Sequence, residues 1–140
     1  MLQSELVRVF ADRPFVVQTF IENIQTEGEF SLFYFNREFS HATLKVPKSG
    51  DFRVQEEHGS RVLSITPEPA LLDTGNKVLA LVEPMPAYAR ADFVRGPDGR
   101  FLIMELELVE PSMYLRMDPA APGRFATAFD RYVRERKGTA

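Results

Sequence analysis

The chain has 140 residues, of which 44% are hydrophobic and 11% aromatic, and this is enough to bury one ordinary globular core. We therefore expect residues 1–140 to form a single domain. The formal net charge of −3 gives no reason to expect nucleic acid or an acidic membrane surface as a partner. Cysteine is absent, which excludes disulfides and thiolate metal sites. The N-terminal residues carry Glu5 and Asp12 without an unbroken apolar stretch, so we expect no secretory signal, no membrane span and a cytoplasmic location.

The first half of the chain is predicted to contain a short helix and an antiparallel meander. An amphipathic helical pattern opens the sequence and ends at Asp12-Arg13-Pro14. Three segments rich in aromatic and β-branched residues follow, a composition typical of strands. They span residues 15–24, 28–36 and 38–47. The connection Asn36-Arg37 is short enough for a two-residue hairpin turn.

The second half is predicted to contain a long loop, two helices and a second hairpin. Residues 47–60 are polar and show no sustained period, which indicates a loop. Thr66 could cap a helix that starts at Pro67 and ends before Pro84. A last helix is expected through Phe125, Phe129, Tyr132 and Val133. Together these elements predict an α+β fold in which an antiparallel β-sheet packs against helices.

The second predicted hairpin covers residues 87–109 and has one charged face. A type I′ turn at Asp98-Gly99 would place Asp92 opposite Glu105 and Arg90 opposite Glu107. Because side chains alternate along a strand, these four residues share one face. The apolar residues expected on the other face are Ala91, Phe93, Leu102, Met104, Leu106 and Leu108.

The charged face of this hairpin is typical of a magnesium site. Directly opposed residues have Cβ atoms about 5 Å apart, so Asp92 and Glu105 would repel one another without a cation. A few carboxylates, with other positions left for water or phosphate oxygens, suit magnesium in ATP-dependent enzymes. Arg90 could hold a phosphate or a developing anion. Two structural alternatives stay open on this pattern alone: a surface hairpin decorated with charges, and an Arg90–Glu107 cross-strand pair.

The segment RADFVRGPDGRFLIMELELVEP resembles the closing hairpin of the ATP-grasp superfamily, exemplified by D-alanine:D-alanine ligase and glutathione synthetase. The family pattern is Arg-x-Asp, a hairpin, then Glu-x-Asn. Arg90, Asp92 and Glu105 match it, and Glu107 stands where the family most often has asparagine. The resemblance implies that Asp92, Glu105 and Glu107 hold magnesium, which manganese could replace. It also implies that Arg90 is a catalytic residue that steadies the transferring phosphoryl group.

An earlier segment, Gln18-Thr19-Phe20-Ile21, resembles the family's hinge, whose backbone and apolar side chains hold adenine. The resemblance therefore implies that Gln18, Phe20 and Ile21 bind the nucleotide. Family members commonly have glutamate where Gln18 stands. Glu29 occupies the place of an acidic residue that bonds the ribose hydroxyls.

The long loop KVPKSGDFRVQEEHGS is similar to a glutathione-synthetase-like pattern of a basic residue, a proline, a small-residue turn and Arg-x-Asn. Lys45, Arg53 and Gln55 take those places. The resemblance implies that Lys45 and Gln55 contact phosphates or substrate, and that Arg53 is a second catalytic residue.

The resemblance covers only the C-terminal half of an ATP-grasp ligase, because neither a glycine-rich lid loop nor the preceding lobe and substrate domain is found in the sequence. In a complete enzyme of this kind, ATP and magnesium activate a carboxylate as an acylphosphate, and an amine then displaces phosphate. We expect the isolated chain to be inactive. ATP and small-molecule carboxylate and amine substrates are the implied partners, and the sequence does not identify the two substrates.

An alternative is a non-catalytic lobe that self-associates or binds another chain. An apolar face normally met by the other lobe would then be exposed, including Phe20, Phe33 and Phe35, and such faces favour a homodimer. His41 is expected in packing or on the surface, and neither it nor His58 is assigned to the metal site. Glu110 stays unassigned between a substrate-side group and a cap.

Overall fold

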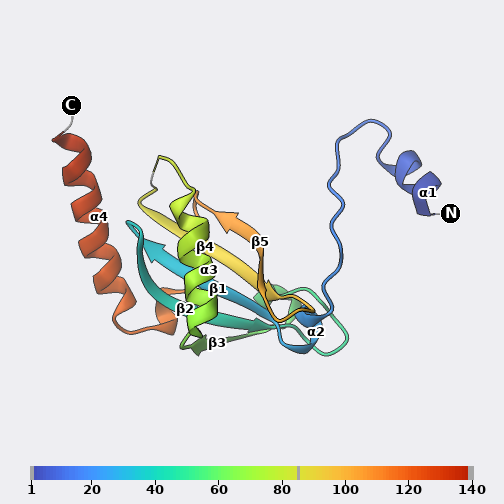
Figure 1. The fold of residues 1–140 in the computed structure, drawn as a ribbon, viewed down its shortest axis with the longest axis horizontal. Coiled ribbons are helices and arrows are strands. Elements are labelled where there is room, and N and C mark those ends of the chain that lie inside the picture. Colours follow the sequence, from blue (N-terminus) through green and yellow to red (C-terminus); the bar gives the residue numbers. More distant parts are fainter. Residues whose placement is uncertain (1, 85, 139–140) are drawn as a thin grey trace.

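The computed structural model describes residues 2–84 and 86–138, and within them five strands form one antiparallel sheet (Figure 1). Their order across the sheet is β3-β2-β1-β4-β5, so β1 lies at the centre. The predicted α+β class is therefore confirmed. The strands are β1 (Glu29–Phe35), β2 (Glu38–Val46), β3 (Arg61–Ile65), β4 (Tyr88–Arg95) and β5 (Phe101–Glu107).

The prediction of a strand over residues 15–24 is wrong. Helix α1 (Leu2–Val9) is present as expected, but an irregular segment follows it and leads into the single turn α2 (Asn23–Thr26). In Figure 1 this segment carries α1 away from the sheet. A composition typical of strands reflects a local backbone preference, but it does not show that a partner strand is available for pairing. Both edges of β1 are already taken by β2 and β4, and β3 occupies the outer edge of β2.

Strand β3 was not foreseen, because its five residues directly follow the long polar loop. The helix after it, α3 (Pro69–Ala80), begins later than predicted, with Glu68 and not Thr66 at the N-cap position. Pro69 occupies the first turn, where a missing backbone N–H costs nothing. Among the described residues, no helix combines the length and the apolar character needed to cross a membrane.

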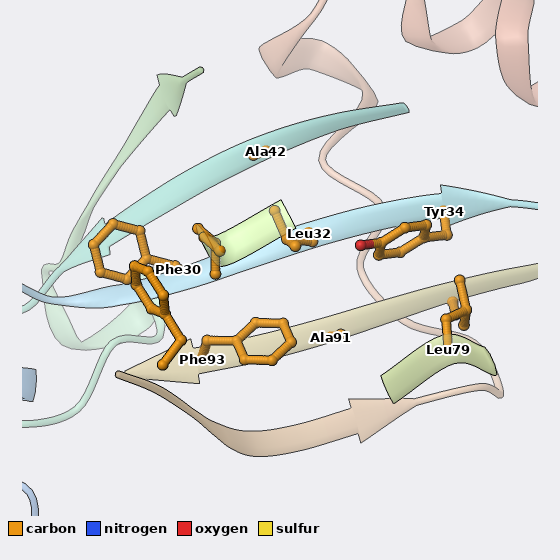
Figure 2. Packing of buried hydrophobic residues seen from close by; sticks show 10 residues of the cluster. Phe30, Leu32, Tyr34, Ala42, Leu79, Ala91 and Phe93 are labelled. Atoms are coloured by element: carbon orange, nitrogen blue, oxygen red, sulfur yellow. The ribbon is translucent and has the colours of Figure 1, made fainter. Parts of the chain in front are cut away.

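Helix α3 covers one face of the sheet and buries the main apolar cluster against it (Figure 2). Leu71 and Leu79 of α3 pack on alternating residues of the two central strands. Gly75 lets the helix approach closely, because a Cβ atom there would overlap the hydroxyl of Tyr34 and the Cδ1 atom of Leu32. The cluster consists of Phe30, Leu32, Tyr34, Ala42, Leu71, Leu79, Ala89, Ala91, Phe93 and Phe101. The opposite face of the sheet carries polar side chains such as Arg90 and Asp92 together with Phe33 and Phe35.

The first hairpin is confirmed. Asn36 and Arg37 both have positive φ, 46° and 69°, and Phe35 faces Glu38. The second hairpin also forms, but its turn is not the predicted two-residue turn. Residues 96–100 make the connection, with the Gly96 N–H donating to the Arg100 carbonyl at 2.7 Å.

A β-bulge restores the predicted register of the second hairpin at the charged residues. Phe93 faces Ile103 near the turn, and the register shifts between Asp92 and Phe93 so that Asp92 faces Glu105. The predicted positions of Leu102 and Met104 are consequently wrong. Leu102 is 38% exposed. Met104 packs against Val94 in a second small cluster, away from α3.

The last helix, α4 (Ala121–Lys137), lies at the end of the sheet opposite α1 (Figure 1). Its Phe125 ring packs on Phe35 with the centroids 5.2 Å apart. Phe33 is covered by Tyr114 and by a stacked His41. The prediction that Phe33 and Phe35 are exposed is therefore wrong, because both are buried. Phe20 is half exposed, as that prediction required.

Candidate functional site

Three carboxylates converge on the polar face of the sheet, where β4 meets β5. One carboxylate oxygen from each of Asp92, Glu105 and Glu107 lies within 4.8 Å of the others. Asp92 is fully buried, whereas Glu105 is exposed at the rim. Burial raises the pKa of Glu105, and the neighbouring Glu107 and Asp92 raise it further. Such an arrangement favours a cation between the three groups.

Arg90 lies within reach of all three carboxylates, as the predicted shared face requires. Its guanidinium is 2.9 Å from an oxygen of Asp92 and 3.7 Å from Glu105, and it also pairs with Glu107. Burial acts to lower the pKa of Arg90, but the carboxylates overcome this effect and the pKa is raised. Arg90 therefore remains a fixed positive charge beside the cluster.

Lys45 and Glu29 extend this cluster across the sheet to β1 and β2. The Lys45 ammonium lies 2.7 Å from the Glu29 carboxylate and 3.6 Å from Asp92. Burial raises the pKa of Glu29, and the charge of Asp92 adds to this effect. Lys45 lies in β2, within the strand predicted over residues 38–47, and its side chain is buried. Lys45 therefore contacts both Glu29, which is predicted to bind ribose, and Asp92, which is predicted to bind the metal.

Two adjoining cavities open beside these residues. A polar cavity of about 450 Å³ is lined by Lys45, Arg90 and the two glutamates of β5. A more apolar cavity of about 300 Å³ is lined by Gln18, Thr19, Phe20, Ile21, Ile24, Phe52, Arg53 and Met104. Glu29, Val54 and Gln55 line both cavities, so they form the wall between them. A polyphosphate chain and an attached ring could occupy the two spaces side by side.

The comparisons with known proteins point to one superfamily. No protein-family model matches the sequence. The chain is 31% identical over 124 residues to the cycloserine biosynthesis protein DcsG of Streptomyces lavendulae. The match covers 81% of this chain and 40% of that protein. The crystal structure of D-cycloserine synthetase DcsG superposes with a TM-score of 0.70 at 25% identity, covering 82% of this chain and 41% of that one.

More distant ATP-dependent ligases share the fold. D-alanine–D-alanine ligase from Bacillus anthracis, solved with ATP, gives a TM-score of 0.60 at 18% identity over 99% of this chain and 48% of that one. The ATP-grasp ligase PsnB, solved with Mg and ADP, gives 0.52 at 18% identity over 75% of this chain and 34% of that one. The chain shares the fold of ATP-grasp ligases. It corresponds to the C-terminal part of these ligases and spans less than half of their length.

The segment that resembles the ATP-grasp hinge lies at the apolar cavity. Gln18, Phe20 and Ile21 all line the apolar cavity, although they are in an irregular segment and not in a strand. The Phe20 ring packs edge-on against Phe52, with centroids 5.8 Å apart. The Gln18 amide donates to the sulfur of Met104 at 3.5 Å. The contacts hold the segment against the long loop and β5.

The loop residues predicted from the ATP-grasp resemblance are divided between the two cavities. Gln55 lines both, whereas Arg53 lines only the apolar one. The Arg53 guanidinium pairs with Asp51 at 2.7 Å and is half exposed. The structure thus brings Arg90 and the carboxylates together but leaves Arg53 outside the polar cavity.

Sequence reasoning missed the segment that follows β5. Ser112 and Tyr114 line the polar cavity, and Glu110, which had been left unassigned, lines it too. Glu110 and Tyr114 adopt positive φ, 47° and 45°. Neither residue type favours this conformation, so no local sequence signal could have placed them. The expectation that His41 has a packing role is confirmed, because it is buried and stacked on Phe33.

Proposed function

We propose that this chain forms the ATP- and magnesium-binding part of an ATP-dependent carboxylate-amine ligase. The observation that carries the proposal is the convergence of Asp92, Glu105 and Glu107 beside Arg90, at a polar cavity that Arg90 and the two glutamates line. The similarity to DcsG, at 31% identity, supports a ligase in particular. Because the reaction consumes ATP, we propose that it takes place in the cytoplasm.

The three carboxylates suit magnesium, which prefers oxygen ligands and keeps several positions for water and phosphate oxygens. Neighbouring ligands of an octahedral magnesium lie roughly 3 Å apart, and opposite ones about 4 Å. The spacing of up to 4.8 Å between the three oxygens needs only small side-chain rotations to match. Glu107 in the place of asparagine adds a negative charge to this set. Bound magnesium or manganese would neutralise charge on the ATP phosphates.

The two cavities suggest how ATP would lie. We propose that adenine enters the apolar cavity beside Phe20 and Ile21, and that Glu29 in the shared wall accepts hydrogen bonds from the ribose hydroxyls. The phosphates would then point towards Lys45 and Arg90 in the polar cavity. Gln55 could bond the phosphates from the wall.

The chemistry would be two successive displacements, without a covalent protein nucleophile. A carboxylate oxygen of the first substrate attacks the γ-phosphorus of ATP, and ADP leaves. The nitrogen of the amine substrate then attacks the carbonyl carbon of the acylphosphate, and phosphate leaves. Arg90 would stabilise negative charge on the transferring phosphoryl group. Arg53 would take part only if it turns from Asp51 towards the polar cavity.

Calorimetric titration of magnesium, with and without ATP, tests the site. Glu105→Gln is the cleaner variant, because Glu105 is exposed, whereas Asp92→Asn also disturbs a buried ion pair. We expect each variant to weaken magnesium binding by at least about tenfold. Asp73→Asn on α3, an exposed carboxylate paired with Lys77, is the matched control and should bind like the wild type. Unchanged binding in both site variants would refute the assignment.

Hydroxylamine trapping tests the reaction in a complete ligase that contains this chain, because the isolated chain is expected to be inactive. Hydroxylamine converts an acylphosphate to a stable hydroxamate, so a panel of amino acids can be screened for ATP-dependent hydroxamate formation. Amino acids are the reasonable panel, because the names of the relatives D-cycloserine synthetase and D-alanine–D-alanine ligase refer to amino-acid derivatives. ADP release without hydroxamate for any acid would contradict the acylphosphate route.

A second candidate, a self-associating or partner-binding module, is favoured by the exposed segment between α1 and α2. Val16 is 93% and Val17 73% exposed, and Phe20 lies nearby. Such a surface favours association with a copy or another chain. Light scattering of the wild type and a Val16→Ser, Val17→Ser variant distinguishes the two: a dimer that the variant abolishes supports this candidate, and a monomer removes it.

A further inference from the structure

A continuous chain of hydrogen bonds runs from α4 to the segment that lines the polar cavity. The Nε–H of Arg124 donates to the Ser40 hydroxyl oxygen at 3.0 Å. The same oxygen lies 2.9 Å from Nδ1 of His41, and Nε2 of His41 lies 3.0 Å from the carbonyl oxygen of Met113. The four residues come from β2, α4 and the segment after β5.

The chemistry of the two end groups fixes the direction of every bond. A guanidinium can only donate and a carbonyl can only accept. Ser40 therefore accepts from Arg124, but its oxygen has a second lone pair, so the direction of its bond with Nδ1 of His41 depends on the carbonyl of Met113 at the other end. Nε2 of His41 must then carry the hydrogen that is donated to Met113. The geometry thus selects one neutral tautomer of His41, with Nδ1 unprotonated.

The surroundings of His41 hold its ring in one position. The ring is 4% exposed and stacks on Phe33 with centroids 4.3 Å apart and planes 8° from parallel. The ring centroid of Phe35 lies 6.1 Å from that of His41. Burial lowers the pKa of His41, which agrees with a neutral ring. A rigid ring of known tautomer can position the group that it bonds.

The bonded group is the residue before Tyr114. Tyr114 adopts φ of 45°, a conformation that non-glycine residues rarely occupy unless neighbouring contacts impose it. Its ring centroid lies 5.8 Å from the ammonium of Lys45 and 6.0 Å from the ring of Phe33. Tyr114 and Ser112 line the same cavity as the candidate metal ligands Glu105 and Glu107.

We propose that His41 is a positioning residue that fixes Tyr114 over Lys45 at the candidate phosphate and metal cavity. The imidazole acts through the Met113 carbonyl, which also sets its tautomer by accepting from Nε2, and Ser40 donates to the unprotonated Nδ1. The role of Tyr114 in ligand binding rests on the proposed function, whereas the tautomer and the anchoring of the segment do not.

Two substitutions separate the hydrogen bond from the packing of the ring. The amide nitrogen of glutamine reaches about as far as Nε2, and that of asparagine about as far as Nδ1, so only His41→Gln can still donate to Met113. We expect His41→Asn to raise the amide exchange rates of residues 113–117 by about tenfold, the effect of one lost hydrogen bond, and to weaken MgATP binding. His41→Gln should restore most of both.

The nitrogen chemical shifts of the His41 ring in the wild type give an independent readout. We expect a protonated Nε2 and an unprotonated Nδ1. A protonated Nδ1, or equal exchange rates in the two variants, would overturn the proposal. If the wild type does not bind MgATP but shows the expected tautomer and exchange rates, the proposed function fails and the anchoring by His41 stands.

Discussion

Glu29, which lines both cavities, forms a buried ion pair with Lys45, whose Nζ atom lies 2.7 Å from the Glu29 carboxylate. The pair connects the wall of the apolar cavity with Asp92, at 3.6 Å from the same ammonium. Each of these groups is largely removed from water, so each depends on the others for charge compensation. The proposed ribose and metal residues are thus parts of one electrostatic unit.

Replacing Lys45 by methionine should destabilise the fold strongly. Lys45→Met leaves Glu29 buried without its partner, and the loss of one member of a buried pair costs about 3 to 5 kcal/mol in the free energy of unfolding. Adding Glu29→Gln should recover part of this loss, because it removes the uncompensated charge. Urea denaturation of the wild type, both single variants and the double variant measures the coupling. Additive effects would show that the pair is not coupled.

Two helical glycines should respond to alanine in opposite directions. Gly75→Ala places a methyl group against Tyr34 and Leu32, and we expect a loss of about 1 to 3 kcal/mol. Gly123→Ala in α4 meets nothing within 4 Å and should stabilise the protein by up to about 1 kcal/mol through helix propensity. Thermal unfolding distinguishes the two. Equal effects would contradict the close approach of α3 to the sheet.

Stability should fall as the pH is lowered below the ordinary pKa of histidine, about 6.5, in part because of His41. Burial lowers the pKa of His41 in the folded state, with Arg124 acting in the same direction and Asp118 and the Met113 and Tyr114 carbonyls opposing it. The unfolded state therefore binds the proton first, and the stability contributed by neutral His41 is lost progressively between the unfolded and the folded pKa.

The difference in unfolding free energy between the wild type and His41→Gln, followed by urea denaturation from pH 7.5 down to pH 5.5, isolates this effect. Glu29 and Glu105, whose pKa values are raised, act in the opposite sense but are common to both proteins. The difference should shrink as the pH falls. A difference independent of pH would show that His41 does not titrate differently on folding.

The charged face of the second hairpin could be predicted from the sequence, although the turn was predicted wrongly. Alternation placed Arg90, Asp92, Glu105 and Glu107 together, and the β-bulge beside Asp92 compensated for the longer turn. Bulges leave no clear local signal, which is why Met104 was assigned to the wrong cluster. Local patterns are sufficient to predict a shared face where the side chains of both strands alternate regularly between the two faces of the sheet.

Other parts of the candidate site depend on contacts between distant segments. The strand that contains Lys45 could be predicted, but its pairing with Glu29 across the sheet follows from the register of β1 and β2, which the local pattern does not give. Tyr114 reaches the cavity through a left-handed conformation that its residue type does not favour. Residues 15–24 have the β propensity of a strand, but they form none beside β1, because β2 and β4 already occupy both of its edges.

Asp92, Glu105 and Glu107 are the residues that we propose hold a divalent cation. Paramagnetic Mn²⁺, added below one equivalent in the presence of ADP, broadens the NMR signals of nuclei close to it. We predict that signals from β4 and β5 around Asp92 and Glu105 broaden first, and that Glu105→Gln reduces this broadening while signals of α3 stay sharp. Broadening centred elsewhere in the chain, or unchanged in Glu105→Gln, would contradict cation binding by these three carboxylates.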